Sequence, residues 1–394
     1  MLHLTVKNFG VLKDIDIELN KTNLFIGDNG SGKSTLAKLI TVVTDFTLDK
    51  DEIIQKLNHF DINFLSETCT IQLIENDEII IEILNLDVIF SDQKNDTLLT
   101  LKTIEANIKL NQLIKKIENK TNIDEIINEI DDITSKELLI KFSKDEANRK
   151  RLNEANQNIN HFKSQYIPSE RNLISFFNQS LSNMITAKIP LPKTLLEFSA
   201  HYNSARNEIK ELDILGMKYK NENSQDKIYY EDGNSLALEN SSSGIQSALP
   251  LYLTLKYFAT KHKNIIIEEP ELNLYPKSQI DTVKYIIENR EESSLSIMTH
   301  SPYILSVLNV LIFAYKASNT NEILKDKIST IIPEKQQINP DEFSAYLIED
   351  GVSKSIKGES TGMIKENVID DIGLMIDDEF AGLMEIYREY KSDK

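Results

Sequence analysis

The sequence contains one cysteine, Cys69, and no tryptophan among its 394 residues. A single cysteine excludes an internal disulfide framework, and it excludes a zinc site built from cysteine thiolates. Glycine is also sparse, at 12 residues. Three glycines within one short loop, "GDNGSGKST" from Gly27, are therefore unusual, and this loop is the first candidate for a functional element.

Long hydrophobic runs and an excess of positive charge are missing as well. Apolar stretches such as "NIIIEE" are far too short to span a bilayer, and the first residues, "MLHLTVKNFG", lack the charged and apolar regions of a signal peptide. We therefore expect a cytoplasmic protein with no membrane contact. The net charge of -18 excludes a globally basic coat for nucleic acid, but a local basic groove for DNA stays open.

With 40% hydrophobic residues, the chain is long enough to bury a large core, and we expect two lobes. The alternating patterns "HLTVKNF" and "DIDIEL" predict half-buried strands, "NLFIG" a strand that enters the glycine loop, and "STLAKLITVV" a buried helix. "CTIQLI" and "EIIIEIL" predict a hairpin. Residues 1–100 are thus predicted to form an N-terminal lobe in which a mixed sheet packs on one helix.

The pattern changes at about residue 101. Apolar residues recur at helical spacing from Leu101 to Ile117, and "SKDE" at Ser143 fits a capping box with Glu146. We interpret residues 101–165 as a helical insertion with a solvated, charged face.

A second lobe is predicted for residues 166–348. "SQYIPSERN" indicates a strand that ends at Pro168, "KIYYEDGNSLALEN" two strands around a turn, and "ALPLYLTLKYFATKH" a buried helix. "NIIIEE" and "SLSIMTHSP" indicate buried strands. Residues 349–394 complete a late hairpin within "FSAYLIEDGVSKSI" and end in an acidic tail, from Asp371 to Lys394, that is predicted to be helical.

The glycine loop satisfies the pattern G-x-x-x-x-G-K-[ST] with Gly27, Gly32, Lys33 and Ser34. A strand before it and a helix after it are the context that this phosphate-binding loop requires. Glycines let consecutive N–H groups converge on phosphate oxygens, and the helix N-terminus adds partial positive charge. We expect Lys33 to reach the β- and γ-phosphates of a nucleotide and Ser34 to ligate Mg²⁺. The competing interpretation is a chance glycine turn before a helix.

Two carboxylates, Glu268 and Glu269, end the stretch "NIIIEE". Adjacent residues of a strand face opposite ways, so the two carboxylates need different roles. Glu268 suits the shell of a magnesium ion, through a water molecule, and Glu269 suits polarising the water that attacks the γ-phosphate. The competing interpretation is a charged loop after a buried strand.

Two further motifs complete the candidate site. "SIMTHSPYIL" places His300 at the end of a strand, where it can sense a γ-phosphate, although a lone histidine is more often structural. In "ENSSSGIQSALPL", Ser243 and Gly244 open an apolar helix that starts near Ile245, and they offer hydroxyl and N–H groups to an anion. Because the chain already has a phosphate loop, a second anion site indicates a partner's nucleotide. The alternative is a serine-rich loop with an ordinary helix cap.

Taken in this order, the four motifs resemble the head of ATP-binding-cassette ATPases, in the branch that contains the SMC, RecF and OLD (overcoming lysogenisation defect) proteins. The likeness extends from Met1 to about Ile348, and "YIPSERN" matches a strand common in the OLD-like group. The resemblance implies an α/β fold, a two-lobed P-loop NTPase with a mixed β-sheet and a helical insertion. It implies ATP and Mg²⁺ as cofactors.

The resemblance also implies a role for each motif. Glu269 and His300 become the catalytic residues, and Ser34 and Glu268 the magnesium ligands. The nucleotide-binding residues become Gly27, Asn29, Gly30, Ser31, Gly32, Lys33, Ser34 and Thr35 of the Walker A loop, with Ser243, Gly244 and Gln246 of the signature loop, which caps ATP on a second subunit. Asn273 falls in the D-loop, and Arg171 is a candidate contact to phosphate or between the lobes.

Some positions depart from the pattern of the family. Glu268 replaces the usual Walker B aspartate, Tyr275 stands where relatives often carry histidine, and Gln72 is only a weak candidate for a Q-loop. Full-length OLD nucleases carry a C-terminal metal-nuclease (Toprim) domain. The stretch after Pro333 is too short for one and lacks its cluster of acidic ligands, so the chain resembles the ATPase half alone.

The leading hypothesis is therefore a soluble ATPase that hydrolyses ATP at composite interfaces of a homodimer or higher homo-oligomer. It would control a separate effector, such as a nuclease or a toxin, in bacterial anti-phage defence. The main alternative is a RecF- or SMC-like ATPase of DNA repair or recombination that binds DNA directly. A third class, the cassette subunit of a transporter, is disfavoured by the missing Q-loop and by the OLD-like N-terminus.

Overall fold

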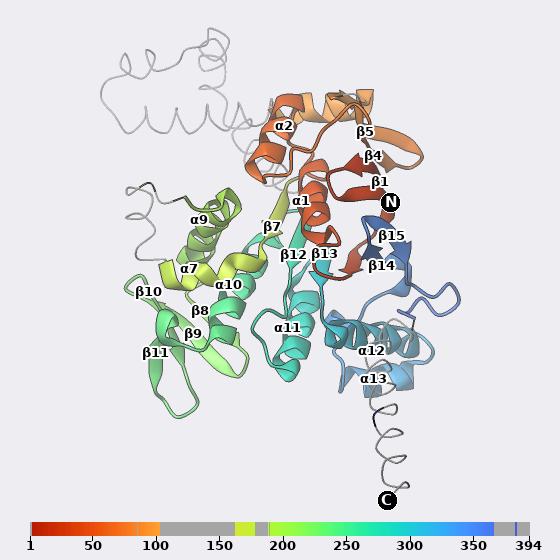
Figure 1. Ribbon diagram of the computed structural model, residues 1–394. Coiled ribbons are helices and arrows are strands. Elements are labelled where there is room, and N and C mark those ends of the chain that lie inside the picture. The colour runs from red at the N-terminus through yellow and green to blue at the C-terminus, as the bar shows by residue number, and fades with distance from the viewer. Residues whose placement is uncertain are drawn as a thin grey trace, which may run out of the picture.

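The computed structural model describes residues 2–84, 86–102, 162–177, 188, 190–365 and 383. Within them, the chain forms a sheet of 11 strands and a smaller sheet of four strands, with helices packed on both faces of the large sheet (Figure 1). The predicted α/β class with a mixed sheet is confirmed. None of the described helices is long and apolar enough to cross a bilayer.

The large sheet has a parallel half and an antiparallel half. The parallel strands are β7 (Ser164–Ile167), β12 (Asn264–Glu268), β13 (Ser294–Thr299), β3 (Thr22–Ile26) and β14 (Phe343–Glu349), in that spatial order. The antiparallel strands are β6 (Asp87–Phe90), β5 (Glu78–Leu84), β4 (Thr70–Glu75), β1 (Leu2–Phe9) and β2 (Leu12–Leu19). Strand β15 (Val352–Ser355) joins the halves, because it pairs antiparallel with β14 and parallel with β2.

Alternate residues of the parallel strands face two separate cores. Ile266 of β12 packs in one core with helices α1 (Lys33–Val43) and α2 (Lys50–His59). Its neighbours Ile265 and Ile267 pack in the other core. The helices on that second face are α9 (Lys193–Glu208), α10 (Ser243–Phe258), α11 (Pro276–Asn289) and α12 (Pro302–Ser318). A strand covered on both faces explains the continuous apolar run of β12.

The smaller sheet packs beside α9 and α10. Its strands are β11 (Ser235–Ala237), β10 (Gln225–Tyr229), β9 (Met217–Glu222) and β8 (Glu211–Ile214), in that order. The buried Asp226 carboxylate of β10 accepts hydrogen bonds from Tyr202, Tyr219 and Asn221, each at 2.8 Å, and pairs with Arg206 at 3.2 Å. Since every donor lies on α9 or β9, these bonds compensate the buried charge and join the sheet to the helix.

The smaller elements complete the described fold. They are the 3₁₀ turn η1 (Ser169–Arg171), α7 (Asn172–Phe177), the 3₁₀ turn η2 (Leu238–Asn240), α13 (Glu322–Ser329), and the 3₁₀ turns η3 (Glu334–Gln336) and η4 (Pro340–Glu342). Helix α10 begins at Ser243, two residues before the predicted start, because Ser242 is its N-cap. The predicted insertion lies almost wholly outside the described residues, as do its capping box and the acidic tail.

The two predicted lobes contribute strands to one continuous sheet. Strand β3, from the predicted first lobe, pairs with β13 and β14 from the second. The boundary between residues 348 and 349 falls inside β14, so it cuts the β14–β15 hairpin rather than separating two units. The two lobes therefore share one sheet, and where they divide stays a prediction.

Candidate active site

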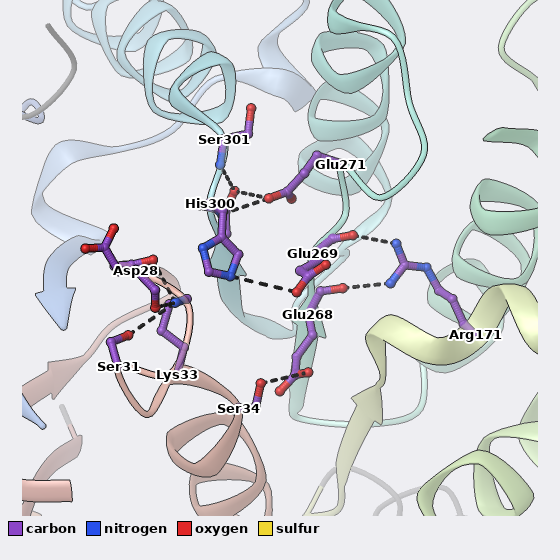
Figure 2. A network of polar contacts seen from close by, with 12 residues as sticks. Asp28, Ser31, Lys33, Ser34, Arg171, Glu268, Glu269, Glu271, His300 and Ser301 are labelled. Carbon is purple, nitrogen blue, oxygen red and sulfur yellow. Dashed lines mark hydrogen bonds and ion pairs between the residues drawn. The ribbon is translucent and has the colours of Figure 1, made fainter. Parts of the chain in front are cut away.

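The predicted motifs meet at the carboxyl ends of three neighbouring parallel strands. The glycine loop follows β3, Glu268 and Glu269 follow from β12, and His300 follows β13. Because β12, β13 and β3 are adjacent and parallel, their carboxyl ends share one edge of the sheet. Figure 2 shows the resulting group of polar side chains, which come from positions far apart in the chain.

The close packing of the phosphate-binding loop explains two of its glycines. A Cβ atom on Gly27 would lie 2.1 Å from the carbonyl oxygen of Ile348, which no side chain can tolerate. Gly32 has a φ angle of 107° and is the N-cap of α1. That backbone region favours glycine. The loop therefore turns tightly against β14 and presents the first turn of α1 to the site. Asn29, Gly30 and Ser34 are exposed on it, and Thr35 is half-buried.

Lys33 folds back onto its own loop. Its Nζ donates hydrogen bonds to the carbonyl oxygens of Gly27 and Asp28, both at 2.7 Å, and to Ser31 Oγ at 3.2 Å (Figure 2). Burial lowers the pKa of Lys33, and the carboxylate of Glu269 opposes that shift. The ammonium group is thus already desolvated and held by neutral acceptors, so an anionic phosphate is a stronger partner for it.

Ser34 and Glu268 form the next contact. Ser34 Oγ donates to Glu268 Oε2 at 3.3 Å, while Glu268 Oε1 is buried without a hydrogen-bond partner among the described residues. Burial, and secondarily the carboxylate of Glu170, raises the pKa of Glu268 to about 7. A hydroxyl beside a carboxylate with an unsatisfied oxygen suits a hard divalent cation, which prefers oxygen ligands. These two residues therefore fit Mg²⁺.

Glu269 lies opposite His300. Its Oε1 atom is 3.8 Å from His300 Nε2, and both side chains are about one-third exposed, at 34% and 32%. The backbone of Glu269 has a φ angle of 44°, in the left-handed region that non-glycine residues seldom adopt. Glu269 follows the last residue of β12, and its conformation ends the strand. The Glu269 carboxylate faces His300, whereas the Glu268 carboxylate faces Ser34. The Glu269 side chain, at 34% exposed, is accessible to a water molecule, whereas Glu268 is 4% exposed.

Glu271 was not among the predicted site residues, yet it joins two parts of the site. Its Oε1 atom accepts hydrogen bonds from Thr299 Oγ1 at 2.7 Å and from the backbone N–H of His300 at 2.8 Å (Figure 2). The carboxylate thereby fixes the loop that carries His300 to the loop that follows Glu269. The available signal was a third acid in "EEPE", two residues after the predicted base.

Arg171 does not reach the phosphate side of the site. Its side chain is 0% exposed, and its guanidinium donates only to main-chain carbonyl oxygens among the described residues. Two of these belong to Glu268 and Glu269, at 2.7 and 2.6 Å (Figure 2). Burial lowers its pKa to about 10. All four acceptors belong to the predicted second lobe, residues 166–348, so these bonds support neither the contact to phosphate nor the contact between lobes.

The signature residues lie apart from this group. Among the described residues, no hydrogen bond or ion pair joins Ser243 or Gly244 to the phosphate-binding loop, and α10 and α1 are separate elements in Figure 1. Ser243 is exposed at the start of α10, and a Cβ atom on Gly244 would lie 3.1 Å from the carbonyl oxygen of Asn273. The start of α10 is thus available to another molecule and lies beside the predicted D-loop.

Two other predicted positions, Gln246 and Gln72, have contacts that explain them within the chain, and a third, Tyr275, is exposed. The buried Gln246 amide donates to the carbonyl oxygens of Leu238, Glu239 and Ser241, so its nitrogen holds the loop before α10 and is not offered to a nucleotide. Gln72 Nε2 donates to Glu82 at 2.7 Å within the antiparallel half of the sheet. Tyr275 is 78% exposed at the N-terminus of α11.

The chain was compared with known proteins. Residues 1–305 match the family model described as AAA ATPase domain. A search of the curated proteins found no match.

Similar solved structures include a Pyrococcus furiosus Smc head domain with an extended coiled coil, bound to the C-terminal domain of ScpA. It is 15% identical, with 90% of this chain and 96% of that chain covered, at a TM-score of 0.35. The Thermotoga maritima SMC head domain is 12% identical. The match covers 91% of this chain and 98% of that chain, with a TM-score of 0.36. CbiO1 of an ABC transporter complex from Clostridium perfringens is 11% identical. The match covers 90% of this chain and 86% of that chain, with a TM-score of 0.32.

Proposed function

The chain belongs to the AAA ATPase domain family and is an ATP hydrolase, and we propose that it hydrolyses ATP at composite sites shared by two copies of the chain. One observation carries the proposal. Lys33, Ser34, Glu268, Glu269 and His300 meet at one edge of the sheet, while in the described part of the chain no hydrogen bond or ion pair joins them to Ser243 or Gly244 of the signature loop. A site assembled from one chain would leave the start of α10 without a function.

The phosphates are bound by the loop from Gly27 to α1. Backbone N–H groups in the first turn of α1 have no acceptor within the helix and can meet phosphate oxygens. The Lys33 ammonium exchanges the carbonyl oxygens of Gly27 and Asp28 for the β- and γ-phosphates. This exchange favours binding because a hydrogen bond between charged groups is roughly twice as strong as one to a neutral acceptor.

Different carboxylates bind the cation and activate the attacking water molecule. Ser34 and Glu268 hold Mg²⁺, and the unsatisfied Oε1 of Glu268 supports this assignment. When bound, the cation neutralises charge on the phosphate oxygens. Glu269 accepts the proton of the water molecule that attacks the γ-phosphorus, and His300 contacts the γ-phosphate from the neighbouring strand. The products are ADP and inorganic phosphate.

The biological role is proposed from the order of the motifs. "GDNGSGKST", "YIPSERN", "EEPELNLYP" and "THSPYIL" resemble the OLD-like branch, in which stand-alone ATPases often accompany a separate effector. We infer that ATP-driven dimerisation of this chain controls such an effector, a nuclease or a toxin, in anti-phage defence. Co-expression with the product of the adjacent gene tests this role. A complex that purifies with ATP and separates after its hydrolysis is expected, and binding of DNA alone would favour the repair ATPase instead.

The enzymatic proposal is tested with Lys33→Ala. We expect kcat/KM for ATP to fall on the order of 100-fold or more, because a charge aimed at the transition state is lost. Lys7→Ala, at an exposed position of β1, is the matched control and is expected to hydrolyse ATP like the wild type. Normal turnover in a folded Lys33→Ala protein would refute the assignment of the phosphate loop.

A further inference from the structure

Arg171 is a fully buried arginine, and in the described part of the chain its hydrogen bonds all go to main-chain carbonyl oxygens. Nε donates to Ser247 at 3.1 Å, Nη1 to Pro168 at 3.0 Å and Glu268 at 2.7 Å, and Nη2 to Glu269 at 2.6 Å. A guanidinium has five N–H donors in a rigid fork, which suits several carbonyl groups at fixed positions. A buried cation without a bonded carboxylate is costly, so a specific purpose is expected for it.

The carbonyl groups belong to three separate segments of the chain. Pro168 precedes Arg171 at the end of β7, Ser247 lies in the second turn of α10, and Glu268 and Glu269 end β12. Ser247 follows the signature residue Gly244 by three positions on the same helix. Figure 2 shows the guanidinium reaching the backbone of both glutamates from the side opposite the phosphate loop. One side chain therefore connects the signature helix to the backbone that carries the two carboxylates.

The backbone at Glu269 needs such support. Its φ angle of 44° is unfavourable for a glutamate, and a residue persists in this region only where the surroundings hold it there. Three contacts do so: the N–H of Glu269 donates to the carbonyl oxygen of Met298 at 2.8 Å, and the carbonyl oxygen of Glu269 accepts from the Leu272 N–H at 3.0 Å and from Arg171 at 2.6 Å. If the guanidinium is removed, the carbonyl oxygen of Glu269 keeps only the Leu272 N–H as a donor, so the peptide is held less firmly and the carboxylate can shift with it.

We propose that Arg171 is a positioning residue for ATP hydrolysis, which holds the Glu268–Glu269 backbone in its reactive conformation and ties it to the signature helix α10. The proposal rests on the proposed role of Glu269 as the base. In a composite dimer, the start of α10 contacts the nucleotide bound to the partner chain. When α10 closes on that nucleotide, Arg171 fixes the position of Glu269, which acts on the nucleotide bound to its own chain. Arg171 thus acts on turnover and leaves the binding of ATP to the phosphate loop unchanged.

The test is Arg171→Lys, which keeps the charge but loses the fork. We expect kcat to fall about ten-fold or more, since small displacements of a reacting group have large effects, while the Kd for ATP changes less than about two-fold. Arg206→Lys is the matched control, because Arg206 is also buried and holds Asp226 in the small sheet. The control is expected to lower the melting temperature without changing kcat. Arg171→Gln, which keeps two N–H donors without the charge, repeats the test.

A double mutant separates positioning from a structural role. If Arg171 acts through Glu269, Arg171→Lys has no further effect on kcat in a Glu269→Gln background, because non-additivity marks residues that act as a unit. An additive loss, or a loss of ATP binding equal to the loss of kcat, would overturn the proposal, as would failure of both Arg171 variants to fold. Wild-type turnover in Glu269→Gln alone would instead refute the proposed base. That outcome differs from the results that would overturn the role of Arg171.

Discussion

His300 Nε2 and Glu269 Oε1 lie 3.8 Å apart, facing each other across the ends of two neighbouring parallel strands. This separation is too long for a hydrogen bond. The two side chains are therefore not hydrogen-bonded to each other, and both can contact a third group that lies beside them. A water molecule and a γ-phosphate are the partners that the phosphate loop would bring to this position.

Replacing Glu269 by glutamine separates ATP binding from hydrolysis. The amide keeps the shape of the side chain but cannot accept the proton, so ATP is expected to bind and persist. We expect kcat to fall on the order of 100-fold or more, with the Kd for ATP nearly unchanged, and the variant to elute as an ATP-bound dimer from a sizing column. If turnover stayed at the wild-type level, the base would have to be another residue, and His300 would be tested next.

Glu271→Ala tests the carboxylate that joins the two loops. It removes the acceptor of Thr299 Oγ1 and of the His300 N–H, so the loop of His300 loses its fixed position. We expect kcat to fall about ten-fold, and the free energy of unfolding to decrease by about 1–3 kcal/mol because two donors lose a charged acceptor. Glu271→Gln keeps one carbonyl acceptor and is expected to recover most of the activity. Equal defects in both variants would mean that the negative charge, and not the hydrogen bonds, matters.

The sequence predicted the elements that build the site, because each has a strong local pattern. β12 is continuously apolar and buried on both faces, and the glycine loop stands between β3 and α1 as its motif requires. Strands β8 and β9 were not predicted. Their sequences, "ELDI" and "MKYKNE", contain many charged residues, and β9 has a single buried residue. Their pairing with β10 and with each other depends on tertiary contacts that periodicity cannot indicate.

The roles of Glu271 and Arg171 could not be predicted for a related reason. Glu271 acts on a loop 28 residues later in the chain, and Arg171 acts on carbonyl groups up to 98 residues away. A charged residue in a loop is usually solvated, so its sequence gives no indication of burial. The fold alone brings main-chain acceptors to a guanidinium from three different elements.

His201 gives the stability a specific dependence on pH. Burial lowers the pKa of His201, with Glu197 opposing the shift, and Gln165 Nε2 donates to its Nδ1 at 2.9 Å. The unfolded chain takes up a proton as the pH falls through about 6.5, while the folded histidine does so only at lower pH. The unfolded state then binds more protons, so the free energy of unfolding decreases as the pH falls below about 6.5.

The measurement is urea unfolding of the wild type and of His201→Gln between about pH 5 and 7.5. The difference in unfolding free energy, wild type minus variant, isolates this group from other titrating residues. It is expected to be constant above about pH 6.5 and to decrease below it. A difference that increases as the pH falls would mean that the folded state raises the pKa of His201.

The composite site is tested with Gly244→Asp. If the start of α10 covers the γ-phosphate of the opposite subunit, the new carboxylate faces that phosphate, and two like charges about 4 Å apart repel by roughly 4 kcal/mol near a protein surface. ATP should still bind each monomer through Lys33, but hydrolysis and ATP-driven dimerisation should fail. Gly244→Ala is the matched control, since a Cβ atom there already lies 3.1 Å from Asn273, and it separates the steric effect from the charge.

Mixing Gly244→Asp with Lys33→Ala is the sharper measurement. Each variant alone is inactive in every composite site. A mixed dimer has one site with both defects and one site with neither, because the phosphate loop and the signature loop of a site come from different chains. Mixing should therefore restore part of the ATPase activity, with a maximum near equal amounts of the two proteins. If subunits exchange and no activity returns, the two composite sites do not work independently, and full activity of Gly244→Asp by itself would eliminate the shared site.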